Sequence, residues 1–69
     1  MTLSPGSLVL GDHVEWRGGE YVVVELESGS GFVTVAPAHP SEELHKIMRF
    51  LHLKGERVLA AYLKPWEGV

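Results

Sequence analysis

The spacing of apolar residues changes once along this chain, and that change restricts the fold more than any other feature. Before Ser41, apolar and polar residues alternate, as where Val14 and Trp16 stand between charged neighbours. Such alternation is typical of a strand with one buried face. After Ser41 the spacing becomes that of an amphipathic helix. The helical apolar set is Leu44, Ile47, Met48 and Leu51. The sequence therefore predicts an α+β fold, with a small, twisted antiparallel sheet first and one helix after it.

Three strands are predicted before the helix, at about residues 8–17, 20–27 and 32–36. The Gly18-Gly19 pair lies between the first two and can adopt the positive φ angles of a two-residue hairpin turn. Pro37 and Pro40 end the pattern, because proline cannot donate a ladder hydrogen bond. The third predicted strand is rich in β-branched and aromatic residues, which favours a strand. The pattern leaves open which of its two faces points toward the core. The predicted core of the first hairpin is Val14, Trp16, Val22, Val24 and Leu26, with Tyr21 and Val23 on the outer face.

The helix is predicted over about residues 42–53, with Ser41 as its N-cap and Gly55 as its C-terminal stop. It should cover the open face of the sheet, since a meander of three strands needs a packing partner. Residues 57–63 are ambiguous, because Leu59-Ala60-Ala61 favours a helix whereas Val58 and Tyr62 favour a strand. We predict a fourth strand there, which would pair with an open edge.

The length of 69 residues allows one domain, 1–69. The absence of cysteine excludes disulfides, a thiolate metal site and a cysteine nucleophile, so stability must come from packing. The N-terminal residues do not show the basic stretch and apolar run of a signal peptide, and no apolar run is long enough to span a membrane. The expectations are therefore a cytoplasmic location and no membrane partner.

No constellation of residues predicts catalysis or a bound cofactor. His45 and His52 are seven positions apart, roughly 10 Å along a helix, which is too far to share one metal ion. No G-x-S-x-G elbow occurs, and Gly29-x-Gly31 lacks the rest of a nucleotide fingerprint. We expect no catalytic residue, no metal and no cofactor, and hence no enzyme.

Charge is distributed unevenly, and it directs attention to the helix. The net charge is −3, which disfavours binding of nucleic acid chiefly through its phosphates. Residues 1–40 contain five carboxylates and one cation, whereas residues 41–69 contain five cations and four carboxylates. At 100° per residue the basic side chains of the helix gather opposite its apolar stripe, with two further apolar residues beside them. An ordinary solvated face has the same composition. The alternative is a partner-binding surface of His45, Lys46, Arg49, Phe50, His52 and Leu53.

The first hairpin also carries a resemblance. Residues 11–24, GDHVEWRGGEYVVV, resemble the G-D-x-V-x-W-x-G-x-x-Y-x-V pattern at the start of small SH3-like β-barrels. The pattern particularly resembles that of the barrel in Mu-type transposases and related integrases, over about residues 11–36. The resemblance implies an SH3-like half-barrel that helps to hold a nucleoprotein or transcription complex together. It implies no catalytic residue.

Two function classes follow. The first is a non-enzymatic binding module or regulator that docks on a larger protein assembly through the helix. The alternative is a nucleic-acid-binding SH3-like barrel of a transposition or transcription complex. Self-association is a further expectation, because an uncovered strand edge or the Phe50 patch could pair two copies.

Overall fold

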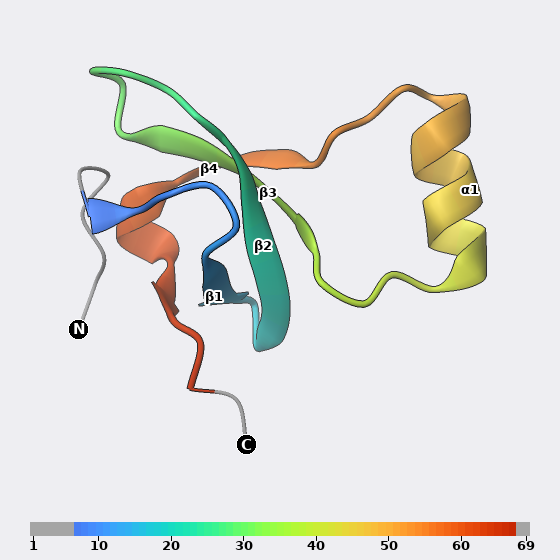
Figure 1. Ribbon diagram of the computed structural model, residues 1–69, viewed down its shortest axis with the longest axis horizontal. Helices are drawn as coiled ribbons and strands as arrows, with labels where there is room; N and C mark the ends of the chain where they lie inside the picture. Colours follow the sequence, from blue (N-terminus) through green and yellow to red (C-terminus); the bar gives the residue numbers. More distant parts are fainter. Residues whose placement is uncertain (1–6, 68–69) are drawn as a thin grey trace.

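The computed structural model describes residues 7–67, which form one antiparallel sheet and one α-helix. The sheet order is β4-β3-β2-β1-β5, and every neighbouring pair is antiparallel. The α+β class and the small antiparallel sheet are therefore confirmed (Figure 1). In chain order the elements are β1 (His13–Trp16), β2 (Gly19–Leu26), β3 (Phe32–Pro37), α1 (Glu42–Phe50), β4 (Glu56–Leu59), the 3-10 helix η2 (Ala60–Tyr62) and β5 (Lys64–Pro65).

The first strand is much shorter than predicted. We expected it to begin near residue 8, but β1 begins at His13. A turn precedes it, in which the Val9 amide donates to a carboxylate oxygen of Asp12 at 3.0 Å and Gly11 has a φ of 90°. Leu8, where we expected the strand to begin, is buried but does not belong to the sheet.

The hairpin between β1 and β2 exists, but its turn is Arg17-Gly18 rather than Gly18-Gly19. Both turn residues have positive φ, 51° and 76°, as in a type I′ turn. Gly19 instead pairs with Trp16 in the ladder. A Cβ on Gly19 would lie 3.4 Å from the ring of Tyr21, an ordinary van der Waals contact, so Gly19 adjoins this ring. That ring packs edge-on against Trp16, with centroids 5.2 Å apart.

The predicted inner face of β2 is wrong. Val23 is buried and Tyr21 packs on the core, whereas Val24 and Leu26 are exposed and Val22 is only half-buried. The register explains the error, because directly paired residues share a face and Val14 pairs with Tyr21. Because the turn between β1 and β2 has two residues, each even-numbered residue of β1 pairs with an odd-numbered residue of β2. Once Val14 and Trp16 are inside, Tyr21 and Val23 must also be inside; after Val23 a register shift in the pairing with β3 ends this alternation.

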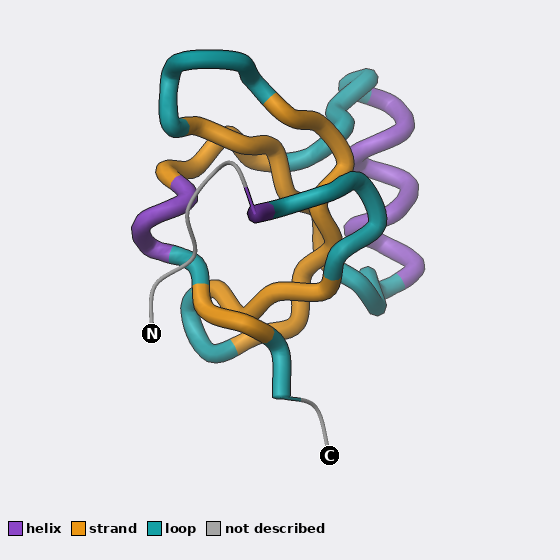
Figure 2. Tube along the Cα trace, turned by 60° about the vertical axis from the view of Figure 1, so that its left-hand side comes forward, coloured by secondary structure: helices purple, strands orange, loops and turns teal. Residues whose placement is uncertain are grey.

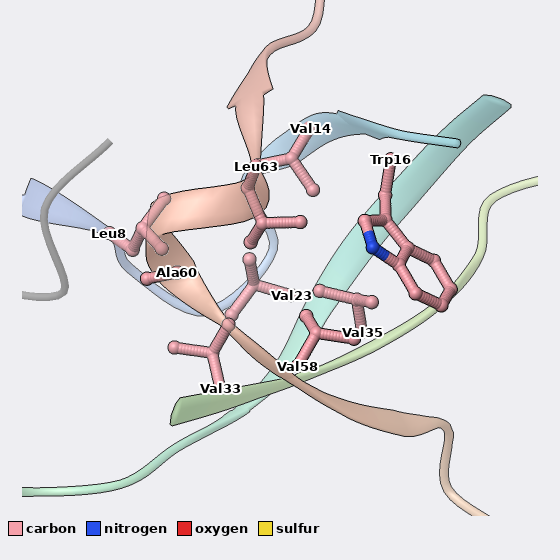
Figure 3. Close-up of a cluster of buried hydrophobic side chains, with 9 residues drawn as sticks. All are labelled: Leu8, Val14, Trp16, Val23, Val33, Val35, Val58, Ala60 and Leu63. Atoms are coloured by element: carbon pink, nitrogen blue, oxygen red, sulfur yellow. The ribbon is translucent and has the colours of Figure 1, made fainter. Parts of the chain in front are cut away.

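The core lies within the curled sheet. On β3 the inward residues are Val33 and Val35, which settles the face that the sequence pattern left open. Figure 3 shows the buried side chains converging from the strands, η2 and the segment before β1. The cluster consists of Leu8, Val14, Trp16, Val23, Val33, Val35, Val58, Ala60 and Leu63.

Residues 57–63 are not one strand. The chain pairs with β3 as β4, turns through η2, and then returns as β5 to pair with β1. Both interpretations of this segment were thus partly right, since Leu59-Ala60-Ala61 does leave the strand for a helical turn. The turn places Ala60 and Leu63 in the core, each fully buried. In the sheet order β4 and β5 are the two edges, so the sheet is open.

Helix α1 begins as predicted and ends earlier. The Leu44 amide donates to the Ser41 hydroxyl at 3.1 Å, which confirms the N-cap. The helix ends at Phe50 because His52 adopts a left-handed φ of 55°. The amides of His52 and Leu53 then donate to the carbonyls of Arg49 and Met48, as in a Schellman motif.

Gly55 has a different role from the helix stop that we predicted. A Cβ at this position would lie 2.3 Å from the carbonyl oxygen of Val35. Glycine is therefore required here because the returning chain passes directly against the backbone of β3.

The predicted cover over the sheet is wrong. No residue of α1 is buried, and Ile47 and Leu51 are 53% and 54% exposed. The strands curl around the interior and α1 lies outside it (Figure 2). The cover is supplied by Leu8 and by the turn that carries Ala60 and Leu63. Because Leu8, Ala60 and Leu63 cover the core of the open, curled sheet, the helix is not needed as a cover.

Candidate functional site

Helix α1 has one side toward the sheet and one toward solvent. Leu44 and Met48 line a hollow together with Tyr21 and Val35 of the sheet, so this side faces inward. Phe50, on the other side, is 83% exposed. The apolar stripe predicted for the helix is thus divided, since Ile47 and Leu51 remain largely in solvent.

A hollow of about 690 Å³ separates α1 from the end of β3. We call it the basic hollow, because its lining contains two histidines, an arginine and a lysine and no carboxylate. Met48 and Leu53 contribute apolar surface to its lining. Its lining residues are Ala36, Pro37, Pro40, His45, Met48, Arg49, His52, Leu53 and Lys54.

Four of the six predicted partner-binding residues meet in the basic hollow. They are His45, Arg49, His52 and Leu53. Lys46 and Phe50 do not line it, although both are exposed. The six residues therefore form two surfaces of α1 rather than one.

The Schellman motif positions the C-terminal part of the basic hollow. Its left-handed residue, His52, reverses the chain, so that His52 and Leu53 both line the hollow beside Arg49. Lys54 also lies within 3.9 Å of a Glu25 oxygen, but the side chains are 78% and 51% exposed. Such exposed pairs contribute little, so Lys54 can still interact with a ligand.

A second hollow, of about 370 Å³, lies on the other side of the Met48 and Leu53 side chains. It is formed by Leu44 from α1, Tyr21 and Val35 from the sheet, and the chain around Gly55. Met48 and Leu53 line both hollows, as does Pro37 at the end of β3, so these side chains lie between helix and sheet. No residue of α1 is buried, and Figure 1 shows the helix to one side of the sheet.

A third hollow brings together aromatic and basic side chains, and the sequence analysis missed it. We call it the aromatic hollow. Arg57 stacks over the Phe32 ring at 3.8 Å, and Arg17 lies over the Trp16 ring at 4.3 Å. These residues come from separate elements, so only the sheet pairing brings them together. The lining residues are Trp16, Arg17, Phe32, Glu56, Arg57, Val58, Leu59 and Tyr62.

Arg57 is held by an ion pair at the edge of this hollow. Its guanidinium donates two hydrogen bonds to the Glu27 carboxylate, at 2.5 and 2.9 Å. The hydrogen bonds from Arg57 lower the pKa of Glu27, and the hydrogen bond to Glu27 raises the pKa of Arg57. The planar ring of Phe32 and the carboxylate together fix the orientation of the guanidinium.

Two histidines far apart in sequence contact a single carboxylate. His13 Nδ1 lies 2.5 Å from one oxygen of Glu20, and His39 Nε2 lies 3.1 Å from the other. Hairpin pairing and the chain after β3 bring these groups together. Within residues 7–67, however, no group of three or more acidic, histidine or cysteine side chains is arranged to hold a metal ion.

Comparison with protein-family models, with curated proteins and with solved structures finds no match for this chain. Within the described part of the chain, no helix has the length and apolar content to cross a membrane.

Proposed function

We propose that this chain is a non-enzymatic protein-binding module that docks on a larger protein assembly through helix α1. The observation that carries the proposal is that α1, a capped helix, contributes no buried residue. A folded helix that the core does not require is a surface available for a partner. The basic hollow beside it supports the same proposal, because its cations and the apolar Met48 and Leu53 suit an acidic segment with an apolar anchor.

A charge reversal in the basic hollow tests the docking function. Tagged protein captures partners from a lysate, and the recovered proteins are quantified by mass spectrometry. Arg49→Glu should lose the partners that the wild type recovers, because it places a carboxylate where the proposed partner carries one. Lys64→Glu is the matched control, since it makes the same charge change on β5, an edge of the sheet that α1 does not adjoin.

The two variants together support or contradict docking through α1. Loss with Arg49→Glu and retention with Lys64→Glu supports docking through α1. Retention of every partner by Arg49→Glu contradicts it. Circular dichroism of both variants checks that the fold is retained.

The second candidate is a nucleic-acid-binding SH3-like barrel. The strand order supports an SH3-like arrangement, because a meander of four strands is followed by a 3-10 turn and a fifth strand that returns to β1. The aromatic hollow supports nucleic-acid binding, since the exposed Tyr62 ring can stack on an unpaired base and the guanidinium groups of Arg17 and Arg57 supply positive charge beside it.

Oligonucleotide titration separates the two candidates. Single- and double-stranded oligonucleotides are titrated at two salt concentrations, with Tyr62→Ala as the test variant and Phe50→Ala, an exposed aromatic residue outside the hollow, as the control. Saturable, salt-sensitive binding that Tyr62→Ala weakens supports the barrel as a nucleic-acid binder. Absence of binding at low salt removes this candidate and leaves the protein-docking proposal unaffected.

A further inference from the structure

Two histidines line the basic hollow without a carboxylate partner. His45 on α1 and His52 in the turn after it are both exposed. In the part of the chain that the structure describes, no carboxylate forms an ion pair or hydrogen bond with either imidazole. By contrast, His13 and His39 both contact Glu20. A proton gained at that pair is matched by a carboxylate, whereas a proton gained in the basic hollow adds unmatched positive charge.

The lining of the basic hollow holds two further cations beside these histidines. They are Arg49 and Lys54, and the Lys54 ammonium lies 3.9 Å from an oxygen of Glu25 on β2. Glu42 lies in the first turn of α1, three positions before the first histidine, and Glu56 lines the neighbouring hollow. The end of β3 and the chain before α1 contribute only uncharged residues. The lining itself therefore contains four groups that can carry positive charge and no acid.

Protonation of the two histidines doubles the positive charge of this lining. Arginine and lysine side chains keep their charge at physiological pH, so two charges are always present. An imidazole gains its charge between about pH 8 and about pH 5. Because these side chains are exposed, water screens each new charge, and one such contact with an anion changes a binding constant by about threefold. The two histidines together should change it by about tenfold.

We propose that the basic hollow is a pH-dependent site for an acidic peptide segment, which binds more tightly when His45 and His52 are protonated. The inference rests on the proposed function, since it takes the partner of α1 to present carboxylates to this hollow. Charge complementarity selects the acidic segment, and Met48 and Leu53 in the same lining accept an apolar side chain from it. By linkage, a segment that favours the charged histidines must also draw protons onto them when it binds.

NMR titration of the full chain with a synthetic peptide of six aspartates and one leucine tests this site. Aspartate is suitable because its carboxylate remains ionised at about pH 5.5. The wild type should bind the peptide about tenfold more tightly at about pH 5.5 than at about pH 7.5. Calorimetry at about pH 6.5, in two buffers of different ionisation enthalpy, should detect proton uptake on binding. The same peptide with asparagine in place of aspartate should show neither effect.

Two double variants locate the effect in the hollow. His45→Gln with His52→Asn should bind the peptide equally at both pH values, because neither new side chain gains a proton. Asparagine is chosen at position 52 because His52 has a left-handed φ of 55°. His13→Gln with His39→Gln is the matched control, since it also removes two imidazoles, both paired with Glu20. The control should keep the tenfold change, and circular dichroism checks that both variants are folded.

Three results would overturn the proposal. They are a wild type that binds the peptide equally at both pH values, a wild type that binds it at neither, and a control variant that loses the pH dependence as fully as the hollow variant does. The docking function is tested separately, by capture of partners with Arg49→Glu at a single pH. Peptide binding that depends on pH, together with unchanged capture by Arg49→Glu, would keep this site and remove the docking function.

Discussion

Shortening one leucine inside the sheet and one leucine on α1 should have very different effects on stability. Leu63 is fully buried, so Leu63→Ala removes three carbons from the core, about 2.4 kcal/mol at 0.8 kcal/mol per group. The cavity left behind adds to this, and buried leucines generally lose about 2.7–5 kcal/mol. Leu51 is 54% exposed, so Leu51→Ala loses at most about 1.1 kcal/mol and leaves no enclosed cavity.

The free energy lost in Leu63→Ala is a large share of the whole free energy of unfolding. A chain of 69 residues has a free energy of unfolding of about 3–10 kcal/mol. Leu63→Ala should therefore lower the melting temperature by at least about 10 °C, since each kcal/mol corresponds to about 4–8 °C in so small a domain.

Urea denaturation followed by tryptophan fluorescence measures both variants. Trp16 is buried in the core, so its emission reports on unfolding of the sheet. The measurement is made at low micromolar concentration, where association does not add to stability. Equal destabilisation by the two substitutions would refute this reasoning, because it would mean that α1 does cover the core.

Two further predictions concern close contacts. Gly55→Ala should destabilise the protein by about 1–3 kcal/mol in a urea titration, because its Cβ would meet the Val35 carbonyl; a change within error would show that the returning chain moves away easily. Glu27→Gln should make stability less sensitive to acid. The pKa of Glu27 is lower in the folded protein because Arg57 hydrogen-bonds the carboxylate. Its contribution is thus present above the unfolded pKa and lost as pH falls through the folded pKa. Urea midpoints measured at successive pH values should fall more steeply for the wild type, and parallel curves would contradict this.

The candidate site was only partly predictable. The six residues chosen on the predicted helix are all exposed, because helical spacing is local information. His45 and Arg49 meet in the basic hollow through that spacing, whereas His52 and Leu53 reach it through the chain reversal after α1. The aromatic hollow was not predictable, since Arg17, Phe32 and Arg57 become neighbours only through strand pairing. The same holds for His13 and His39 around Glu20.

By itself, the sequence determined those features that depend on short stretches of chain. The alternation around Val14 and Trp16, the glycine turn after them and the cap at Ser41 each involve a few neighbouring residues. Local backbone geometry and short-range hydrogen bonds are sufficient to specify them.

Only the tertiary structure decided which apolar surfaces meet. Val23 rather than Val24 lies inside because pairing with β1 and β3 sets the face of β2. Leu63, not the stripe on α1, completes the core, because η2 and β5 bring it back over the sheet. The hydrophobic effect is non-directional. An amphipathic sequence therefore predicts that a helix has an apolar face, but it does not specify which part of the protein covers that face.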